Sequence, residues 1–90
     1  MTPESLRSPA DLCEALRGAI RSALPGAGVT VEAGSPGHFE IRVSAESFAG
    51  KSMVEQQQMV YGAIAHFMRG EAAPVHAIDR LLTEMPSSGA

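Results

Sequence analysis

The sequence predicts a small α+β domain whose elements follow the order helix, strand, strand, helix, strand. Three observations predict it. Apolar residues recur at every fourth position from Leu12 to Leu24, and segments of alternating apolar and polar residues flank Gly34–Gly37. A second set of apolar residues at helical spacing follows Gly50. A strand, helix, strand connection within one sheet is almost always right-handed and parallel. We therefore expect a three-stranded mixed sheet with the helices packed on one face.

The first helix is predicted to begin at Pro9, since Ser8 and Asp11 provide a capping side chain and an acidic first turn. It should end at Leu24, because Pro25-Gly26 cannot continue a helix. The apolar positions between these ends lie on one face of the helix, which predicts that this face is buried: Leu12, Leu16, Ile20 and Leu24.

A β-hairpin is predicted next, because two segments of alternating apolar and polar residues flank the turn residues Gly34-Ser35-Pro36-Gly37. The apolar residues of its first strand are Val29, Val31 and Ala33. The second strand should place Phe39, Ile41 and Val43 on one face. Its other face should carry His38, Glu40, Arg42 and Ser44.

The second helix is predicted after the Gly50 turn, with Ser52 as its cap and a Ser-x-x-Glu spacing to Glu55. Its apolar stripe comprises Met53, Val60, Tyr61, Ile64, Phe67 and Met68. The pattern allows a break near the start of the helix, and Gly70 stands where a C-cap would be. A third strand is predicted over Val75–Leu82, although its DRLLTE portion is also compatible with a helix.

The segment FAGKS, from Phe48 to Ser52, ends as a phosphate-binding P-loop does. A P-loop needs a first glycine five positions before the second, and position 45 holds an alanine. The intervening Glu46 would repel phosphate, and the Phe48 ring would not fit a backbone cradle. We therefore interpret FAGKS as a turn into a helix.

The length of 90 residues allows one small core, which we assign to residues 8–85, with flexible ends at 1–7 and 86–90. Ten acidic and seven basic residues give a net charge of −3 without a basic cluster, which argues against autonomous nucleic-acid binding. The single cysteine excludes an internal disulfide and suits a reducing compartment. With no apolar run long enough for a signal peptide or membrane span, we expect a cytoplasmic protein.

The residues that could carry chemistry are few. No spacing pairs a nucleophile with a base or brings two carboxylates together, so an enzyme is not expected. Cys13 falls near the apolar face of the first helix, where a small buried residue is favoured over a reactive thiol. His66 lies off the apolar stripe, and we expect it to be solvated and without a role.

His38 and His76 are the candidate ligand pair. If the third strand is parallel to the second and adjacent to it, both imidazoles lie near strand starts at one edge of the sheet. They could then bind a soft transition metal or complete a cluster held by a partner. Two ordinary surface histidines are the alternative. Because two imidazoles fall short of the four ligands of a closed site, any metal site must be shared.

The segment GHFEIRVSAESFAGKSMVEQQQMVYGAI, followed by VHAI at Val75–Ile78, resembles the BolA family. The shared features are an HF strand start, F-x-G-x-S, a polar segment leading into VY, and a late HA pair. The resemblance extends over Val29–Leu82 and favours the shorter bacterial members. It implies a class II KH-like αββαβ domain without enzymatic activity.

The resemblance also implies a partner and a cofactor. BolA-like proteins pair with monothiol glutaredoxins and share a bridged 2Fe-2S cluster, to which the glutaredoxin contributes cysteine and glutathione. The late histidine of the family corresponds to His76. The second family ligand, a cysteine or histidine in the hairpin loop, has no match within Gly34–Gly37, and His38 is the nearest candidate.

Two other functions stay open from the sequence. One is a nucleic-acid-binding regulator of transcription, although the GSPG turn joins two strands and has no basic residues beside it. The other is a homodimer that uses its open sheet face to bind a protein partner.

Overall fold

The computed structural model describes residues 8–70 and 73–86. Its α-helices and strands are α1 (Pro9–Ala23), β1 (Gly28–Ala33), β2 (His38–Ser44), α2 (Met53–Ile64) and β3 (Ala77–Glu84). Two short 3₁₀ helices flank α2, at Glu46–Phe48 and Ala65–Phe67.

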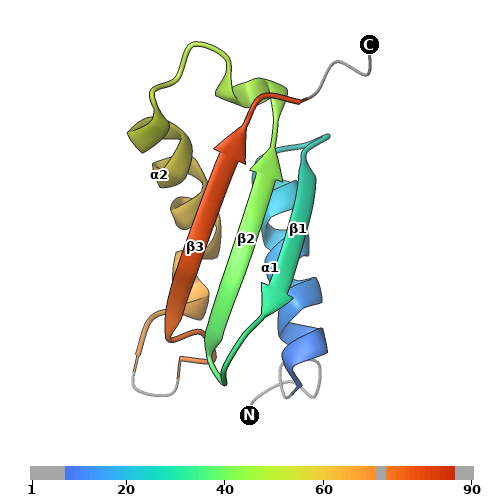
Figure 1. The fold of residues 1–90 in the computed structure, drawn as a ribbon, viewed down its shortest axis with the longest axis vertical. Coiled ribbons are helices and arrows are strands. Elements are labelled where there is room, and N and C mark those ends of the chain that lie inside the picture. Colours follow the sequence, from blue (N-terminus) through green and yellow to red (C-terminus); the bar gives the residue numbers. More distant parts are fainter. Residues whose placement is uncertain (1–7, 71–72, 87–90) are drawn as a thin grey trace.

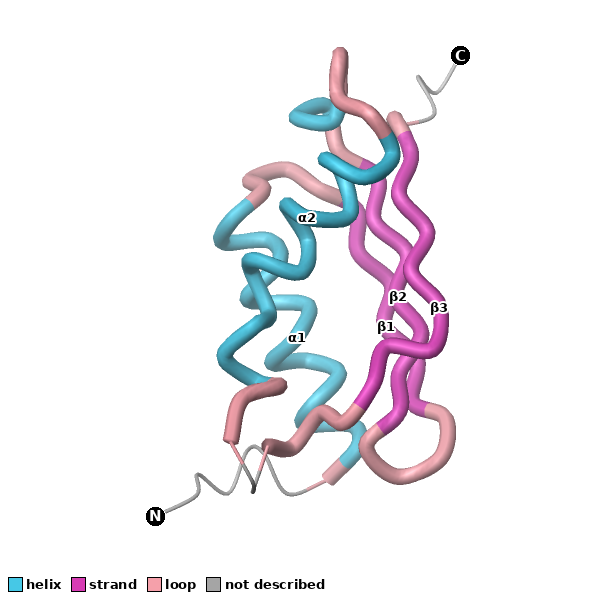
Figure 2. The backbone as a smooth tube through the Cα atoms, turned by 90° about the vertical axis from the view of Figure 1, so that its left-hand side faces the viewer, coloured by secondary structure: helices cyan, strands magenta, loops and turns pink. Residues whose placement is uncertain are grey.

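The sheet has the strand order β1-β2-β3, with β1 antiparallel and β3 parallel to β2 (Figure 1). Both α-helices lie on one side of the sheet, so its other face is open (Figure 2). The predicted α+β fold with a mixed sheet is confirmed. Its assignment to the KH-like class stays a prediction.

Serine caps begin both helices, as the sequence predicts. The Ser8 hydroxyl accepts a hydrogen bond of 3.1 Å from the Asp11 backbone N–H. At α2, the Ser52 hydroxyl accepts from the Glu55 backbone N–H, while the Glu55 carboxylate accepts from the Ser52 backbone N–H at 2.8 Å. These bonds satisfy backbone donors that have no partner within the helix.

The core lies between the sheet and the helices. The residues of β2 alternate as predicted, with Phe39, Ile41 and Val43 buried. The largest fully buried side chains are Phe39, Phe48, Leu16, Ile20, Ile64, Val43, Val60 and Val75. Because Phe48 is in this core, the FAGKS segment cannot form a phosphate cradle, and Gly50 makes a turn with a left-handed φ of 75°.

The second helix differs from the prediction at its end. It leaves α-helical geometry after Ile64 and tightens into the 3₁₀ turn Ala65–Phe67, so the break lies near its C-terminus. Gly70 does have a left-handed φ of 85°, but it comes three residues after that turn. Met53 and Tyr61 are exposed, because the buried stripe is the narrower one through Val60 and Ile64.

The third strand is correctly predicted as a strand but shifted by two residues, to Ala77–Glu84. A bulge interrupts its pairing with β2, since Phe39 pairs with Ile78 while Glu40 pairs with Arg80. Thr83 is the buried polar residue of the strand, and its hydroxyl donates to the Gln56 side chain of α2 at 2.8 Å. This hydrogen bond joins the end of β3 to α2.

The proposed flexible ends, 1–7 and 86–90, lie outside the described residues apart from Pro86. The domain limits of 8–85 stay a prediction. Within residues 8–70 and 73–86, no helix has the length and apolar character needed to cross a bilayer.

Candidate functional site

The candidate site begins with the hairpin turn. The His38 backbone N–H donates to the Ser35 carbonyl at 2.8 Å, closing a four-residue turn with Pro36 and Gly37 at its centre. Proline suits the first central position of a type II turn, and the left-handed φ of 79° at Gly37 suits the second. This turn fixes where β2 and His38 begin.

The start of β3 is attached to the same turn. The Gly37 carbonyl accepts two backbone hydrogen bonds, from His76 at 2.8 Å and from Ala77 at 3.1 Å. His38 then pairs with Ala77 in the parallel register. These contacts place the His76 backbone beside Gly37, the residue that precedes His38, as expected for adjacent parallel strands.

Gly37 also leaves room for the His76 ring. A Cβ on Gly37 would lie 2.9 Å from Cγ of His76 and closer still to its Cδ2. Glycine is therefore needed here for two reasons, a left-handed backbone and the close approach of an imidazole. The sequence showed Gly37 only as a turn residue.

His38 contacts Asp79 on the outer face of the sheet. The distance from Nδ1 of His38 to Oδ1 of Asp79 is 2.8 Å, with 39% of the His38 and 51% of the Asp79 side chain exposed. An ionised carboxylate can only accept a hydrogen bond, so this contact requires a proton on Nδ1. In the neutral ring, Nε2 is then free to act as a ligand.

The donor set fits a shared metal centre and not a self-contained one. Among the residues the structure describes, no group of three or more histidine, cysteine, aspartate or glutamate side chains could hold a metal. The edge supplies two imidazoles, His76 being exposed and His38 half-buried. These residues could therefore contribute to a cluster whose other ligands come from a partner.

Cys13 lies at the margin of the core and not at the histidine edge. It is half-buried in α1, packed against the buried cluster. Burial raises the pKa of its thiol, and the nearby Arg17 guanidinium opposes that rise in part. A higher pKa means less thiolate at neutral pH, which favours the interpretation of a packing residue.

His66 is exposed within the 3₁₀ turn, where its ring lies 4.2 Å from that of Phe67 between centroids. The turn lies beside the segment that leads to His76, since the Val75 backbone N–H donates to the Phe67 carbonyl at 3.2 Å. Among the described residues, however, His66 does not complete a group of three metal-binding side chains with the candidate pair.

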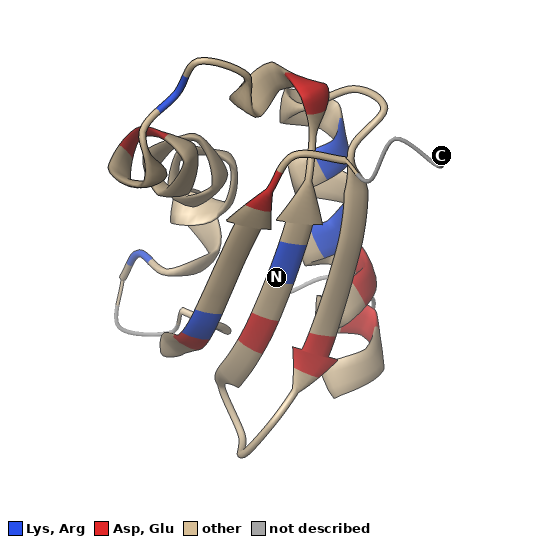
Figure 3. Ribbon diagram, turned by 45° about the horizontal axis from the view of Figure 1, so that its top comes forward, with Lys and Arg blue, Asp and Glu red and all other residues tan. Residues whose placement is uncertain are grey.

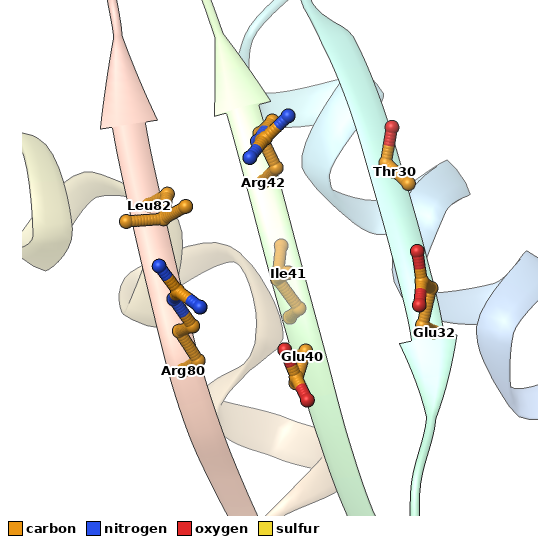
Figure 4. Close-up of a pocket in the computed structure, with 7 residues that line it drawn as sticks. All are labelled: Thr30, Glu32, Glu40, Ile41, Arg42, Arg80 and Leu82. Carbon is orange, nitrogen blue, oxygen red and sulfur yellow. The ribbon is translucent and has the colours of Figure 1, made fainter.

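The open sheet face has a different character. A shallow hollow of about 150 Å³ lies there, lined by Thr30, Glu32, Glu40, Ile41, Arg42, Arg80 and Leu82 (Figure 4). Acidic and basic residues are interspersed along the strands of the sheet (Figure 3). A nucleic-acid surface would concentrate positive charge, so this mixture does not favour the nucleic-acid alternative.

Comparison with known protein families assigns the chain to one family. The family model for BolA-like protein matches residues 21–84, which include the turn, both histidines and all three strands. The chain belongs to the BolA family. The suspected resemblance is thereby confirmed, whereas the ligand roles that it implies for His76 and His38 stay predictions. No curated protein shows a significant sequence match.

Solved BolA structures have a similar fold. BolA1 from Arabidopsis thaliana is 18% identical with a TM-score of 0.69, covering 87% of this chain and 95% of its own. A bolA protein homologue from Coxiella burnetii is 26% identical with a TM-score of 0.65, covering 81% and 88%. The BolA domain of SufE1 from Arabidopsis thaliana is 17% identical with a TM-score of 0.65, covering 83% and 92%.

Proposed function

We propose that this BolA-family protein is a non-enzymatic adaptor that pairs with a monothiol glutaredoxin and shares a 2Fe-2S cluster with it. The observation that carries the proposal is that His38 and His76 lie at the neighbouring starts of β2 and β3, where His38 pairs with Ala77 and the His76 backbone N–H donates to the Gly37 carbonyl. The Gly37 carbonyl holds the two strand starts together, and both side chains are accessible to a partner.

The division of ligands follows from what this chain lacks. It offers imidazole nitrogen at the edge, whereas its single cysteine is in α1. Thiolate ligands must therefore come from the glutaredoxin and glutathione, in keeping with the thiolate preference of iron–sulfur clusters. The proposal assigns the protein to cluster assembly, trafficking or iron sensing in the cytoplasm, where a free thiol stays reduced.

The first test removes the predicted family ligand. We expect His76→Ala to abolish the change that this protein causes in the visible circular dichroism spectrum of a cluster-loaded glutaredoxin. The imidazole is exposed, so the variant should keep its fold and far-ultraviolet spectrum. His38→Ala should weaken the change less, and Cys13→Ser should leave it as it is in the wild type.

An unaltered cluster spectrum from the His76→Ala complex would contradict the ligand role. Gel filtration separates docking from ligation, since His76→Ala can still bind the glutaredoxin through other contacts. If the wild-type protein neither changes the spectrum nor comigrates with the glutaredoxin, the adaptor function itself is wrong.

A further inference from the structure

Asp79 is the extra residue of the β3 bulge. Phe39 pairs with Ile78 and Glu40 with Arg80, so Asp79 has no direct partner on β2. Bulges of this kind redirect a side chain locally and occur often beside functional sites. Here the redirected carboxylate contacts His38 at 2.8 Å.

Packing explains why the bulge forms. In an uninterrupted register Asp79 would pair with Glu40, and Arg80 would take the inward position that follows Ile78. The bulge instead pairs Glu40 with Arg80 and packs Leu81 against the core. Packing alone, however, does not require that the extra residue be an acid beside a histidine.

The chemistry of the contact is specific. Neutral imidazole has two tautomers, and a carboxylate acceptor at Nδ1 selects the one with its proton on Nδ1. The lone pair is then on Nε2, the ring nitrogen on the side away from Asp79. Metal-binding histidines usually donate their other ring N–H to a carboxylate, a carbonyl or water, which fixes the orientation of the ring.

We propose that Asp79 is a positioning residue that holds His38 as an Nε2 ligand for the shared cluster. The inference rests on the proposed adaptor function and identifies His38 as its second ligand. It assigns Asp79 no contact with the cluster. Asp79 acts through the orientation and tautomer of His38.

The first experiment needs no cluster. Long-range proton–nitrogen-15 correlation spectra of the isolated protein, recorded at about pH 8 where imidazole is neutral, report the tautomer of each histidine. We expect His38 to be mainly Nδ1–H in the wild type and to shift toward Nε2–H in Asp79→Ala. Asp79→Asn retains an acceptor oxygen and should shift less. Glu84→Ala, which removes an exposed carboxylate from the end of the same strand, should leave His38 unchanged.

The second experiment measures cluster sharing with a cluster-loaded monothiol glutaredoxin. Removing the hydrogen-bond partner of a metal ligand typically weakens metal affinity about 10–100-fold. We expect Asp79→Ala to weaken binding of the shared cluster by a factor in that range. Glu84→Ala should bind as the wild type does. Adding Asp79→Ala to a His38→Ala protein should cause no further loss, because the carboxylate acts only through that ring.

Two results would overturn the inference. One is an unchanged His38 tautomer in Asp79→Ala; the other is an equal loss of binding from Asp79→Ala with and without His38. The adaptor function fails in a different way, through a wild-type protein that does not alter the glutaredoxin spectrum. The nitrogen-15 spectra decide the role of Asp79 toward His38 in either case.

Discussion

The turns at Gly37 and Gly50 have different structural roles. The first precedes β2, and the second follows β2 and leads into α2 (Figure 1). Gly37 and Gly50 both have left-handed φ values, 79° and 75°. A Cβ at Gly50 would have no atom within 4 Å, whereas at Gly37 it would collide with the ring of His76. The Gly50 turn starts a helix, and the Gly37 turn places a histidine. The same residue type at a turn therefore indicates function only when its neighbours are known.

The largest expected effect separates these two turns. Gly37→Ala and Gly50→Ala should each lose about 1–2 kcal/mol of stability, because alanine is strained at positive φ. Only Gly37→Ala should also lose the cluster spectrum with glutaredoxin, since its Cβ displaces His76. Chemical denaturation and visible circular dichroism measure the two effects. Equal cluster spectra in the two variants would show that the His76 ring does not depend on Gly37.

A smaller effect is expected at the helix cap beyond Gly50. Ser52→Ala removes the hydroxyl that accepts from the Glu55 N–H and should cost about 1 kcal/mol of stability. The cluster spectrum should not change, because Ser52 lies beyond the C-terminal end of β2, whereas the histidines lie at the starts of β2 and β3. The nearby exposed Ser47 has no side-chain hydrogen bond within the described part of the chain, so Ser47→Ala is the matched control. Equal melting temperatures for the two variants would contradict the role of the cap.

The smallest effect concerns pH. The Ser52 backbone N–H, and then its hydroxyl group, hold the pKa of Glu55 below its usual value. A carboxyl with a depressed folded-state pKa stabilises the fold above its unfolded pKa and loses that contribution as pH falls through the folded value. The wild type should therefore be slightly more stable than Glu55→Gln at neutral pH, and the difference should vanish in acid. A difference that persists unchanged in acid would exclude the carboxylate as its source.

Local patterns predicted most of the fold because its elements depend on nearby residues. Ser8 and Ser52 cap the helices as their spacings indicate, and β2 alternates as its sequence does. The exact position of β3 could not be predicted, because its register depends on Glu40 of another strand. The DRLLTE segment has no simple alternation for two reasons. The bulge at Asp79 interrupts the alternation at its start, and further along Leu82 lies on the open face while the polar Thr83 is buried.

The candidate site was predictable in part. The order of strands is enough to bring His38 and His76 to one edge, and the structure places them there. Gly37 and Asp79 were missed as site residues, because their importance lies in contacts across β2 and β3. An acidic residue next to a basic one within an apolar strand is the signal that could have suggested Asp79.

The two hydrogen bonds that Gly37 accepts make the site sensitive to local opening. β3 is an edge strand, and its first amides are attached to the hairpin through that one carbonyl. Fraying of this end would separate His76 from His38 while α1 and the hairpin stayed folded. A ligand that bridges both imidazoles binds only the closed form and shifts the opening equilibrium by mass action. Ligand binding at the site would then be detected as slower hydrogen exchange of the His76 and Ala77 backbone amides.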